Sequence, residues 1–211
     1  MLFRDRIHAA NELARALAAC RGRHPLVLAI PRGAVPMGRI IADQLEGELD
    51  VVLVRKLGAP SNPEFAVGAI DERGWAYVAD YAARVGASEA YLEGEKASQL
   101  ELMRERRLRY TPSRPPIDPA GRVVIVVDDG LATGATMIAA LHAVRARKPA
   151  RLICAVPVGA PDSVEKVRPH CDELVCLHAP EDFSAVGQFY RTFGQVDDAE
   201  VMAALAAGRK A

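Results

Sequence analysis

Two adjacent carboxylates, Asp128 and Asp129, follow an aliphatic run over residues 123–127. A loop of small and hydroxyl-bearing residues comes next, with the sequence Gly-Leu-Ala-Thr-Gly-Ala-Thr over 130–136. The aliphatic run is typical of a buried strand, and the loop opens into a predicted helix that starts at Ala135. Backbone N–H groups at the start of a helix lack intrahelical partners and attract anions. The pattern therefore predicts a phosphate-binding loop with two carboxylates close to it.

Two carboxylates repel a nearby anion unless they hold hydroxyl groups or a metal ion, which favours a phosphorylated sugar as the ligand. The alternative is that Asp128 and Asp129 cap the helix while the Thr-Gly pair shapes a turn. Other phosphate motifs do not fit, because the chain has no Gly-x-Gly-x-x-Gly pattern. Gly33 and Gly38 have the spacing of a Walker A loop, but Arg39 and Ile40 follow where that loop requires Lys and Ser or Thr.

Cationic side chains follow two earlier predicted strands. Arg32 lies in a Pro-Arg-Gly turn after the first strand, and Arg55 and Lys56 follow the aliphatic run at 50–54. If both strands end at the edge that carries the phosphate loop, these three cations converge there and favour a highly charged anion. The alternative is that they are solvated loop charges.

The elements that must position these residues alternate along the chain. Short apolar runs of strand length are expected at 26–30, 50–54, 122–127, 152–158 and 173–177. Helices are expected at 5–20, 35–45, 135–147, 162–167 and 197–207. Apolar strands that alternate with helices are typical of an open, mostly parallel α/β sheet covered on both faces. Ligands of such sheets bind beyond the carboxyl ends of the strands, where the candidate residues lie.

The alternation stops between 58 and 119. A turn-rich stretch at 58–63 is followed by a predicted hairpin over 66–80, with its turn at 71–74. A long polar helix is expected at 88–110, and a proline-rich connector follows it. We interpret this region as an insert in the α/β core.

Composition excludes several classes of protein. The 27 Lys and Arg balance the 27 Asp and Glu, which argues against a nucleic-acid-binding protein. The chain has no apolar run near the roughly 20 residues that span a bilayer and no secretory apolar segment at its start, so we expect a cytoplasmic protein that binds no membrane. Its 4 cysteines form no CxxC pair and are expected to be buried thiols.

The segment 123–137 closely resembles the ribose-5-phosphate loop of the type I phosphoribosyltransferases, in which a strand, two acids and a loop ending in Thr-Gly-x-Thr follow one another. The resemblance implies that Asp128 and Asp129 hold the ribose hydroxyls of phosphoribosyl pyrophosphate (PRPP). It also implies a binding site for the 5′-phosphate of PRPP, made by Ala132, Thr133, Gly134, Ala135 and Thr136.

Two further stretches are similar to this family. The segment 30–34 resembles its pyrophosphate loop, and Arg55-Lys56 resembles a pair in adenine phosphoribosyltransferases. The resemblance thus assigns pyrophosphate binding to Arg32, Gly33, Arg55 and Lys56. The likeness is greatest to a bacterial group of predicted phosphoribosyltransferases that share the pattern Val-Arg-Lys-x-Gly-Ala-Pro-x-Asn-Pro-Glu.

The resemblance implies one phosphoribosyltransferase domain over residues 1–211, an open, mostly parallel sheet flanked by helices. Its core is expected at about 5–57 and 120–178, a long mobile insert at 58–119, and a small hood at 179–211. A homodimer is also implied by the resemblance alone.

The implied reaction is the Mg²⁺-dependent transfer of the 5-phosphoribosyl group of PRPP to a nitrogenous acceptor, such as a nucleobase, with release of pyrophosphate. Asp128 and Asp129 would contact the Mg²⁺ directly or through water. The alternatives are a regulatory protein that binds PRPP without turnover and a phosphosugar enzyme outside this family.

The insert and the C-terminal region offer further candidates. The insert must close over the site to exclude water, and Glu64, a candidate catalytic residue, is one candidate for this role. The other is a basic run at Arg104, Arg106, Arg107 and Arg109, whose alternative is a solvated helix face paired with Glu101 and Glu105. The candidates for acceptor binding are Phe183, Phe189 and Tyr190, whose alternative is core packing. Trp75 is expected either to cover the site or to lie in an interface.

One departure from the family narrows the acceptor. Ala132 stands where 6-oxopurine phosphoribosyltransferases have an acid that acts as a base toward the purine. We therefore expect no acid–base catalysis from this loop and poor turnover of hypoxanthine and guanine.

Overall fold

A computed structural model describes residues 2–112 and 114–207, except for the side chain of Glu64. Its main sheet has five parallel strands in the order β2-β1-β6-β7-β8. These strands are β1 Leu26–Ala29, β2 Glu48–Val51, β6 Val123–Val127, β7 Arg151–Val158 and β8 Glu173–His178. The central strand β6 pairs with β1 and β7 and is almost wholly buried, as its five aliphatic residues predict. The expected parallel α/β sheet is confirmed.

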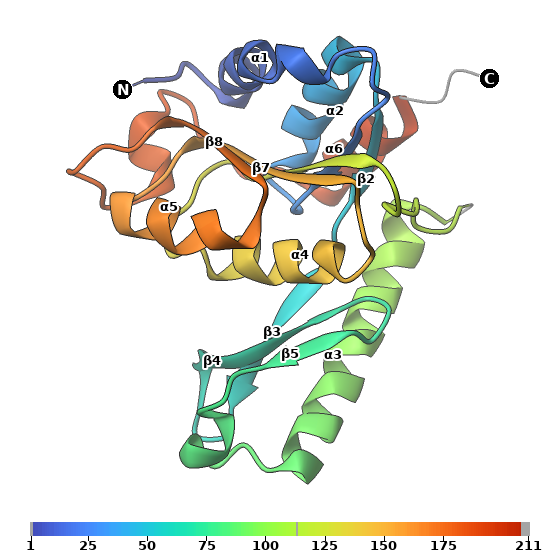
Figure 1. Cartoon of the computed structure of the whole chain (residues 1–211), viewed down its shortest axis with the longest axis vertical. Coiled ribbons are helices and arrows are strands. Elements are labelled where there is room, and N and C mark those ends of the chain that lie inside the picture. The colour runs from blue at the N-terminus through green and yellow to red at the C-terminus, as the bar shows by residue number, and fades with distance from the viewer. Residues whose placement is uncertain (1, 113, 208–211) are drawn as a thin grey trace.

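Helices cover both faces of this sheet (Figure 1). One face carries α1 Arg6–Ala16, α2 Val35–Leu45 and α6 Asp198–Ala207. The other carries α4 Ala135–Arg145 and α5 Pro161–Val167. Each face has its own hydrophobic core, because successive side chains of a strand point to opposite faces: Val27 and Ile125 pack on one side, and Leu28 and Val126 on the other. Of the 3-10 helices among the described residues, Ala18–Cys20, Arg168–His170 and Val186–Phe189 belong to this main unit, and Ala82–Val85 lies outside it.

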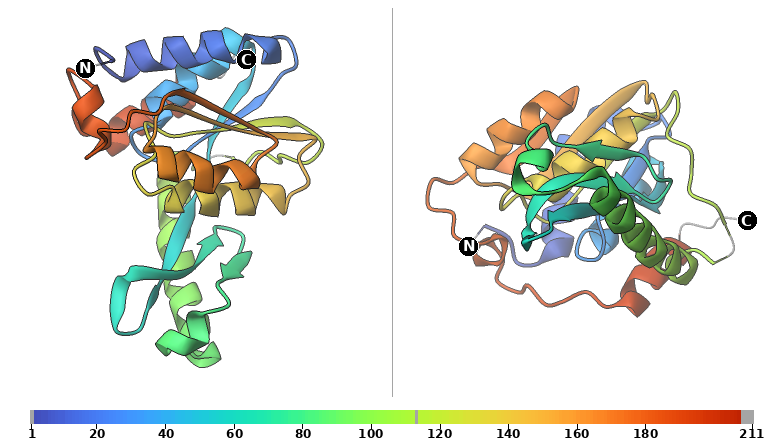
Figure 2. Two further views of the ribbon diagram at one scale, coloured as in Figure 1. Left: turned by 60° about the vertical axis from the view of Figure 1, so that its left-hand side comes forward. Right: turned by 90° about the horizontal axis from the view of Figure 1, so that it is seen from below.

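A second, smaller unit projects beyond α4 (Figures 1 and 2). It is an antiparallel sheet in the order β3-β4-β5, with β3 Val54–Ala59, β4 Asn62–Asp71 and β5 Ala76–Val78. The 22-residue helix α3 Glu89–Tyr110 packs against it, and the hydroxyl of Ser88 caps this helix as its start predicts. The hairpin expected at 66–80 is present as β4 and β5.

One expectation about this unit is wrong. The run at 50–54 was expected to be one parallel strand followed by Arg55 and Lys56, but β2 ends at Val51 and a new strand begins at Val54. Arg55 and Lys56 therefore lie on the small antiparallel sheet, which takes in residues 54–57 that we assigned to the core. The continuous apolar run gives no local signal of the change in direction, because its residues are buried in both units.

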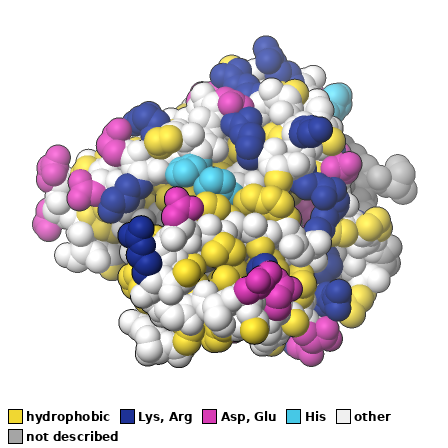
Figure 3. Space-filling model, turned by 60° about the horizontal axis from the view of Figure 1, so that its bottom comes forward, with side chains coloured by type: hydrophobic (Ala, Val, Ile, Leu, Met, Phe, Trp, Pro, Cys, Tyr) yellow, Lys and Arg dark blue, Asp and Glu magenta, His cyan; other side chains and the backbone are white. Residues whose placement is uncertain are grey.

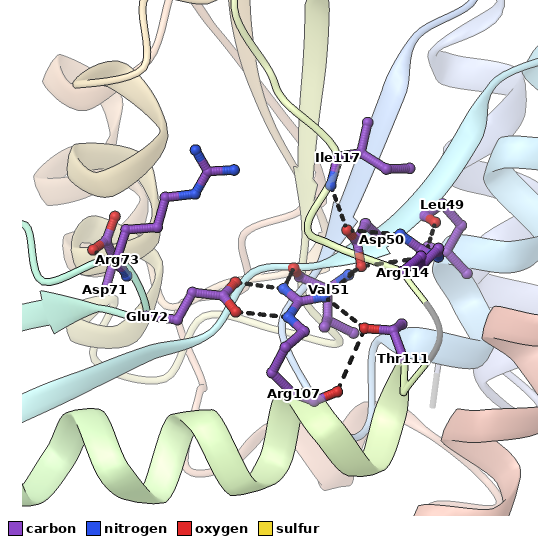
Figure 4. Close-up of polar contacts among 10 residues, drawn as sticks. All are labelled: Leu49, Asp50, Val51, Asp71, Glu72, Arg73, Arg107, Thr111, Arg114 and Ile117. Carbon is purple, nitrogen blue, oxygen red and sulfur yellow. Dashed lines mark hydrogen bonds and ion pairs between the residues drawn. The ribbon is translucent and has the colours of Figure 1, made fainter.

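A buried arginine ties α3 to the main sheet (Figure 4). The guanidinium of Arg107 donates to Asp50 of β2 at 2.7 Å, to both carboxylate oxygens of Glu72, and to the carbonyl of Val51 at 2.9 Å. Asp50 also accepts from Arg114 at 3.0 Å. Arg107 is 8% exposed, so its place in a solvated basic run is wrong. Burial raises the pKa of Glu72, and the contact with Arg107 opposes that rise.

Aromatic rings join the small sheet to α4. Tyr77 of β5 stacks on His142 of α4 with 5.0 Å between ring centroids, and Trp75 stacks on the same ring at 6.1 Å. His170 contacts the ring of His142 at 4.7 Å. Trp75 thus lies at an interface within the chain. Burial of the His142 ring, and to a smaller extent the neighbouring His170, lowers the pKa of His142.

The end of the molecule that carries the small unit exposes apolar side chains (Figure 3). Phe65 and Tyr81 are both more than a third exposed and lie 5.8 Å apart between ring centroids.

Among the described residues, no helix is long and apolar enough to cross a membrane. All four cysteines are free thiols, with Cys20 and Cys154 buried, while Cys171 and Cys176 are only half-buried, which corrects the expectation for these two.

Candidate functional site

Two half-buried carboxylates lie at the carboxyl end of β6. Oδ1 of Asp128 accepts a hydrogen bond from the backbone N–H of Asp129 at 2.8 Å. Oδ2 of Asp129 accepts two hydrogen bonds from Arg6 of α1, from Nε at 2.9 Å and from Nη2 at 2.8 Å. Within the described part of the chain, no donor binds Oδ2 of Asp128 or Oδ1 of Asp129. One oxygen of each carboxylate is therefore left to accept from a hydroxyl group or to bind a cation.

The electrostatics of this pair favour such a ligand. Burial and the adjacent Asp129 carboxylate raise the pKa of Asp128 well above its usual range, while the N–H of Asp129 and the charge of Arg6 act in the opposite direction. Two adjacent negative charges are stabilised by hydrogen-bond donors or by a cation between them. The pair is thus suited to a ligand that presents two hydroxyls or a bridging metal ion.

The loop after the carboxylates leads into α4 without a side-chain cap on its first turn. Gly134, the N-cap residue, has φ +75°, and a Cβ there would lie 2.9 Å from Cγ2 of Val167. The hydroxyl of Ser163 on α5 donates to the carbonyl of Ala132 at 2.8 Å and holds the loop in place. Thr133 and Thr136 are exposed. The N–H of Ala135 donates to the hydroxyl oxygen of Thr133 at a long 3.5 Å, and the other N–H groups of this first turn and the hydroxyl of Thr136 can face an anion, as the sequence predicts.

The turn after β1 packs directly on the carboxylates. A Cβ on Gly33 would lie 2.2 Å from Oδ2 of Asp129, so only glycine allows this approach. The peptide bond between Pro31 and Arg32 is cis. The side chain of Arg32 points toward α6, where its Nη1 lies 3.8 Å from Oδ1 of Asp198. Arg32 thus does not converge with Arg55 and Lys56 in this structure.

A cleft of about 430 Å³ opens between the two units beside this turn. The turn after β1 contributes Pro31, β3 contributes Arg55 and Lys56, α4 contributes Thr136, and α3 contributes Glu95, Gln99 and Arg106. Arg55 Nε donates to the side-chain carbonyl of Gln99 at 2.7 Å. In the described part of the structure, Arg55, Lys56 and Arg106 form no ion pair with a carboxylate. Its described lining thus holds three cations and one carboxylate, Glu95, a net positive charge that suits a highly charged anion.

The other candidates lie in different places. The backbone of Glu64 is in β4, and its side chain is outside the described residues. Phe189 and Tyr190 are 8% and 3% exposed and pack against the N-terminal segment, so the alternative of core packing applies to both. Phe183 is partly buried against Phe189, with 5.1 Å between ring centroids.

The other three arginines of the basic run on α3 lie in different surroundings. Arg104 pairs with Glu101 on the exposed face of the helix, as the solvated alternative predicts. Arg109 pairs with Asp198 at 2.7 Å, and only Arg106 reaches the cleft.

Two residues at the site, Arg6 and Phe193, were missed by the sequence analysis. Arg6 binds Asp129 across 123 positions, and Phe193 lies under its guanidinium, 3.8 Å from Cζ to the ring centroid. Nothing local distinguishes Arg6 from the other arginines of the chain. The cluster of aromatic residues near the C-terminus was the one available signal for Phe193.

The described residues hold no group of three or more His, Cys, Asp or Glu side chains that could bind a metal ion by themselves. The donor set at Asp128 and Asp129 fits Mg²⁺ that takes its other ligands from water and from the phosphates of a substrate, because Mg²⁺ commonly binds with only one or two carboxylates.

This chain is similar to known proteins over most of its length. The model of the family described as "Phosphoribosyl transferase domain" matches residues 4–193. The protein named "Putative phosphoribosyl transferase Rv0571c" from Mycobacterium tuberculosis is 42% identical over 205 residues, which are 97% of this chain and 46% of that protein. The chain thus spans less than half the length of this curated relative.

Solved structures show the same fold. The crystal structure of TT1426 from Thermus thermophilus is 49% identical, with a TM-score of 0.89 over 98% of this chain and 99% of that chain. The hypoxanthine-guanine phosphoribosyl transferase of L. donovani matches with a TM-score of 0.50 at 13% identity, over 87% of this chain and 84% of that chain. At that identity, the second match indicates the fold alone.

Proposed function

Because this chain belongs to the phosphoribosyltransferase family, we propose that it transfers the 5-phosphoribosyl group of PRPP to a nitrogenous acceptor and releases pyrophosphate. The observation that carries the proposal is the pair of open oxygens on Asp128 and Asp129 beside a helix start that no side chain caps. A phosphorylated sugar with two neighbouring hydroxyls matches this arrangement of acceptors and N–H donors.

Each part of the site then has a role toward PRPP. The open oxygens of Asp128 and Asp129 accept from the ribose hydroxyls, and the loop 132–136 donates N–H groups and hydroxyls to the 5′-phosphate. The turn at Pro31–Gly33 and the cations Arg55 and Lys56 lie where the pyrophosphate would leave. Bound together with PRPP, Mg²⁺ would neutralise part of the charge on the leaving group.

The chain contributes position and charge rather than a covalent intermediate. Displacement at C1 of the ribose builds positive charge on the sugar and negative charge on the pyrophosphate. Arg55, Lys56 and Arg106 line the cleft and stabilise the negative charge that develops on the pyrophosphate. Asp128 and Asp129 fix the ribose ring so that the acceptor approaches C1 from a defined side.

One residue of the loop, Ala132, bears on which nitrogenous acceptor the chain uses. Ala132 is exposed on the loop and has no acidic group, so we propose that adenine-like acceptors are used better than hypoxanthine or guanine. Efficient turnover of hypoxanthine by this chain would contradict that preference. The homodimer stays a prediction.

Titration calorimetry with PRPP, with and without Mg²⁺, tests the proposal first. We expect binding that Mg²⁺ strengthens and that Asp129→Asn weakens at least tenfold, about 1.4 kcal/mol. Asp43→Asn is the matched control, because Asp43 is an exposed carboxylate on α2 that pairs with Arg39. No binding at millimolar PRPP would contradict the proposal. Binding without pyrophosphate release for any nitrogenous acceptor would indicate a PRPP-binding regulatory protein instead.

A further inference from the structure

The guanidinium of Arg6 binds one oxygen of Asp129 and leaves the other open. Both of its donors, Nε and Nη2, point to Oδ2, and Oδ1 has no partner among the described residues. The two side chains are only 14% and 17% exposed, so this ion pair is shielded from water. A charge-assisted contact of this kind fixes the carboxylate much more firmly than a solvated pair does.

The C-terminal segment holds Arg6 in this place. The third nitrogen, Nη1, donates to the carbonyl of Gly194 at 2.6 Å, and the guanidinium lies over the ring of Phe193 at 3.8 Å. That ring packs closely on Gly187, where a Cβ would lie 3.0 Å from Cδ1 of Phe193. The hydroxyl of Tyr190 donates to the backbone carbonyl of Asp129 at 2.7 Å. Residues 187–194 thus fix both members of the pair.

The turn after β1 closes the remaining side of Oδ2. The backbone of Gly33 approaches this oxygen so closely that a Cβ would lie 2.2 Å from it. A ligand can therefore reach the carboxylate only at Oδ1. On the neighbouring residue, Oδ2 of Asp128 is the open oxygen, because Oδ1 accepts from the N–H of Asp129.

We propose that Arg6 is a positioning residue for sugar recognition: it binds Oδ2 of Asp129 so that Oδ1 accepts a hydrogen bond from a ribose hydroxyl. The proposal rests on the proposed function, since it concerns the same sugar site. The positive charge of Arg6 also offsets the repulsion between Asp128 and Asp129, which lets both carboxylates accept hydrogen bonds from neighbouring hydroxyls.

The opposite interpretation is that Arg6 blocks Asp129 and must leave before a sugar binds. Two features argue against it. All three guanidinium nitrogens already have acceptors, and the contact lies on the oxygen that Gly33 encloses rather than on the open one. The two interpretations predict opposite changes in affinity when Arg6 is replaced.

The test measures selectivity for a hydroxyl group, which a merely structural role would not change. Ribose 5-phosphate and its 2-deoxy and 3-deoxy analogues are titrated into the full chain, with inorganic pyrophosphate as a probe that has no hydroxyls. The variants are Arg6→Met, which removes the donors but keeps an apolar contact with Phe193, and Arg6→Lys, which keeps the charge but not the planar pair of donors. Arg15→Met on the same helix is the control, because Arg15 is exposed and pairs with Glu12, away from Asp129.

We expect Arg6→Met to lower the affinity for ribose 5-phosphate at least tenfold. Its preference for ribose 5-phosphate over one deoxy analogue should fall toward one, while its affinity for pyrophosphate should stay within twofold of wild type. Arg6→Lys should recover part of the preference, and Arg15→Met should match wild type. Phe193→Leu serves as a second variant if Arg6→Met does not fold, and it should lower the same preference to a smaller extent.

Three results would overturn the inference. An unchanged preference in Arg6→Met, with Phe193→Leu also unchanged, would mean that Arg6 does not position Asp129 toward the sugar. Tighter binding of ribose 5-phosphate by Arg6→Met would mean that Arg6 blocks the site. Failure of wild type to bind either ribose 5-phosphate or PRPP would overturn the proposed function as well, which separates that failure from the other two.

Discussion

Replacing Arg107 by methionine is expected to destabilise the chain by about 3 kcal/mol, because it removes a buried cation from between two carboxylates. Arg107 is 8% exposed and donates to Asp50, to Glu72 and to the carbonyl of Val51. Methionine fills a similar volume, so the loss is chiefly electrostatic. Removing one partner of a buried ion pair costs about 3–5 kcal/mol, since the remaining charge has no counterion.

The structure places the loss at the lower end of this range. Asp50 keeps Arg114 at 3.0 Å and the N–H of Ile117 at 2.9 Å, so its charge stays compensated. Glu72 loses its ion-pair partner, and burial already raises its pKa. Without Arg107 that pKa rises further, and protonation of Glu72 limits the cost.

Urea denaturation of wild type and Arg107→Met at pH 7 and at pH 5 measures the effect. Where an acid has a higher pKa in the folded chain than in the unfolded chain, the folded chain loses stability as pH rises from the lower of these pKa values to the higher. The deficit of Arg107→Met should therefore be smaller at pH 5 than at pH 7. Arg104→Met is the control, because Arg104 forms an exposed pair with Glu101, and we expect a change of no more than about 0.5 kcal/mol.

A rescue variant sharpens the test. Glu72→Gln in the Arg107→Met background removes the uncompensated charge and should recover a large part of the lost stability. The reasoning is refuted if Arg107→Met lies within about 1 kcal/mol of wild type, since a buried pair should cost more. It is also refuted if the second substitution lowers stability further.

Three other predictions concern the site and the contact between the two units. Asp128→Asn should weaken PRPP binding at least tenfold yet raise the free energy of unfolding at pH 7. Burial and Asp129 raise the pKa of Asp128, so ionisation of this carboxyl group opposes folding. Denaturant titrations should show that the gain in stability grows as pH rises above about 4. Gly33→Ala should push Asp129 away and lower PRPP affinity at least tenfold by calorimetry, whereas Gly94→Ala, whose Cβ would meet no atom within 4 Å, should leave affinity unchanged. Tyr77→Ala should expose His142 and raise its pKa toward 6.5, which NMR titration of the ring can follow; an unchanged pKa would mean that the stack does not shield it.

The sequence by itself determined most elements of the main sheet and the edge at which the candidate site lies, but not the end of β2 at Val51. Aliphatic runs of strand length and the hydroxyl of Ser88 at the start of α3 are local signals, and the structure confirms the helix expected at 35–45 to the residue. Since parallel strands end at one edge of the sheet, the sequence also places Asp129 and Gly33 at that edge, while their contact follows from the pairing of β1 with β6 in the structure.

Only the tertiary structure decided which charged groups meet. Arg107 and Asp50 are 57 residues apart, and Arg6 and Asp129 are 123 residues apart, so no spacing in the sequence marks either pair. Arg32 and Arg55 look alike as loop cations, yet one turns to Asp198 and the other lines the cleft. A charged side chain takes its partner from whatever the packing of distant elements brings within reach, and that packing depends on the burial of the whole chain rather than on local pattern.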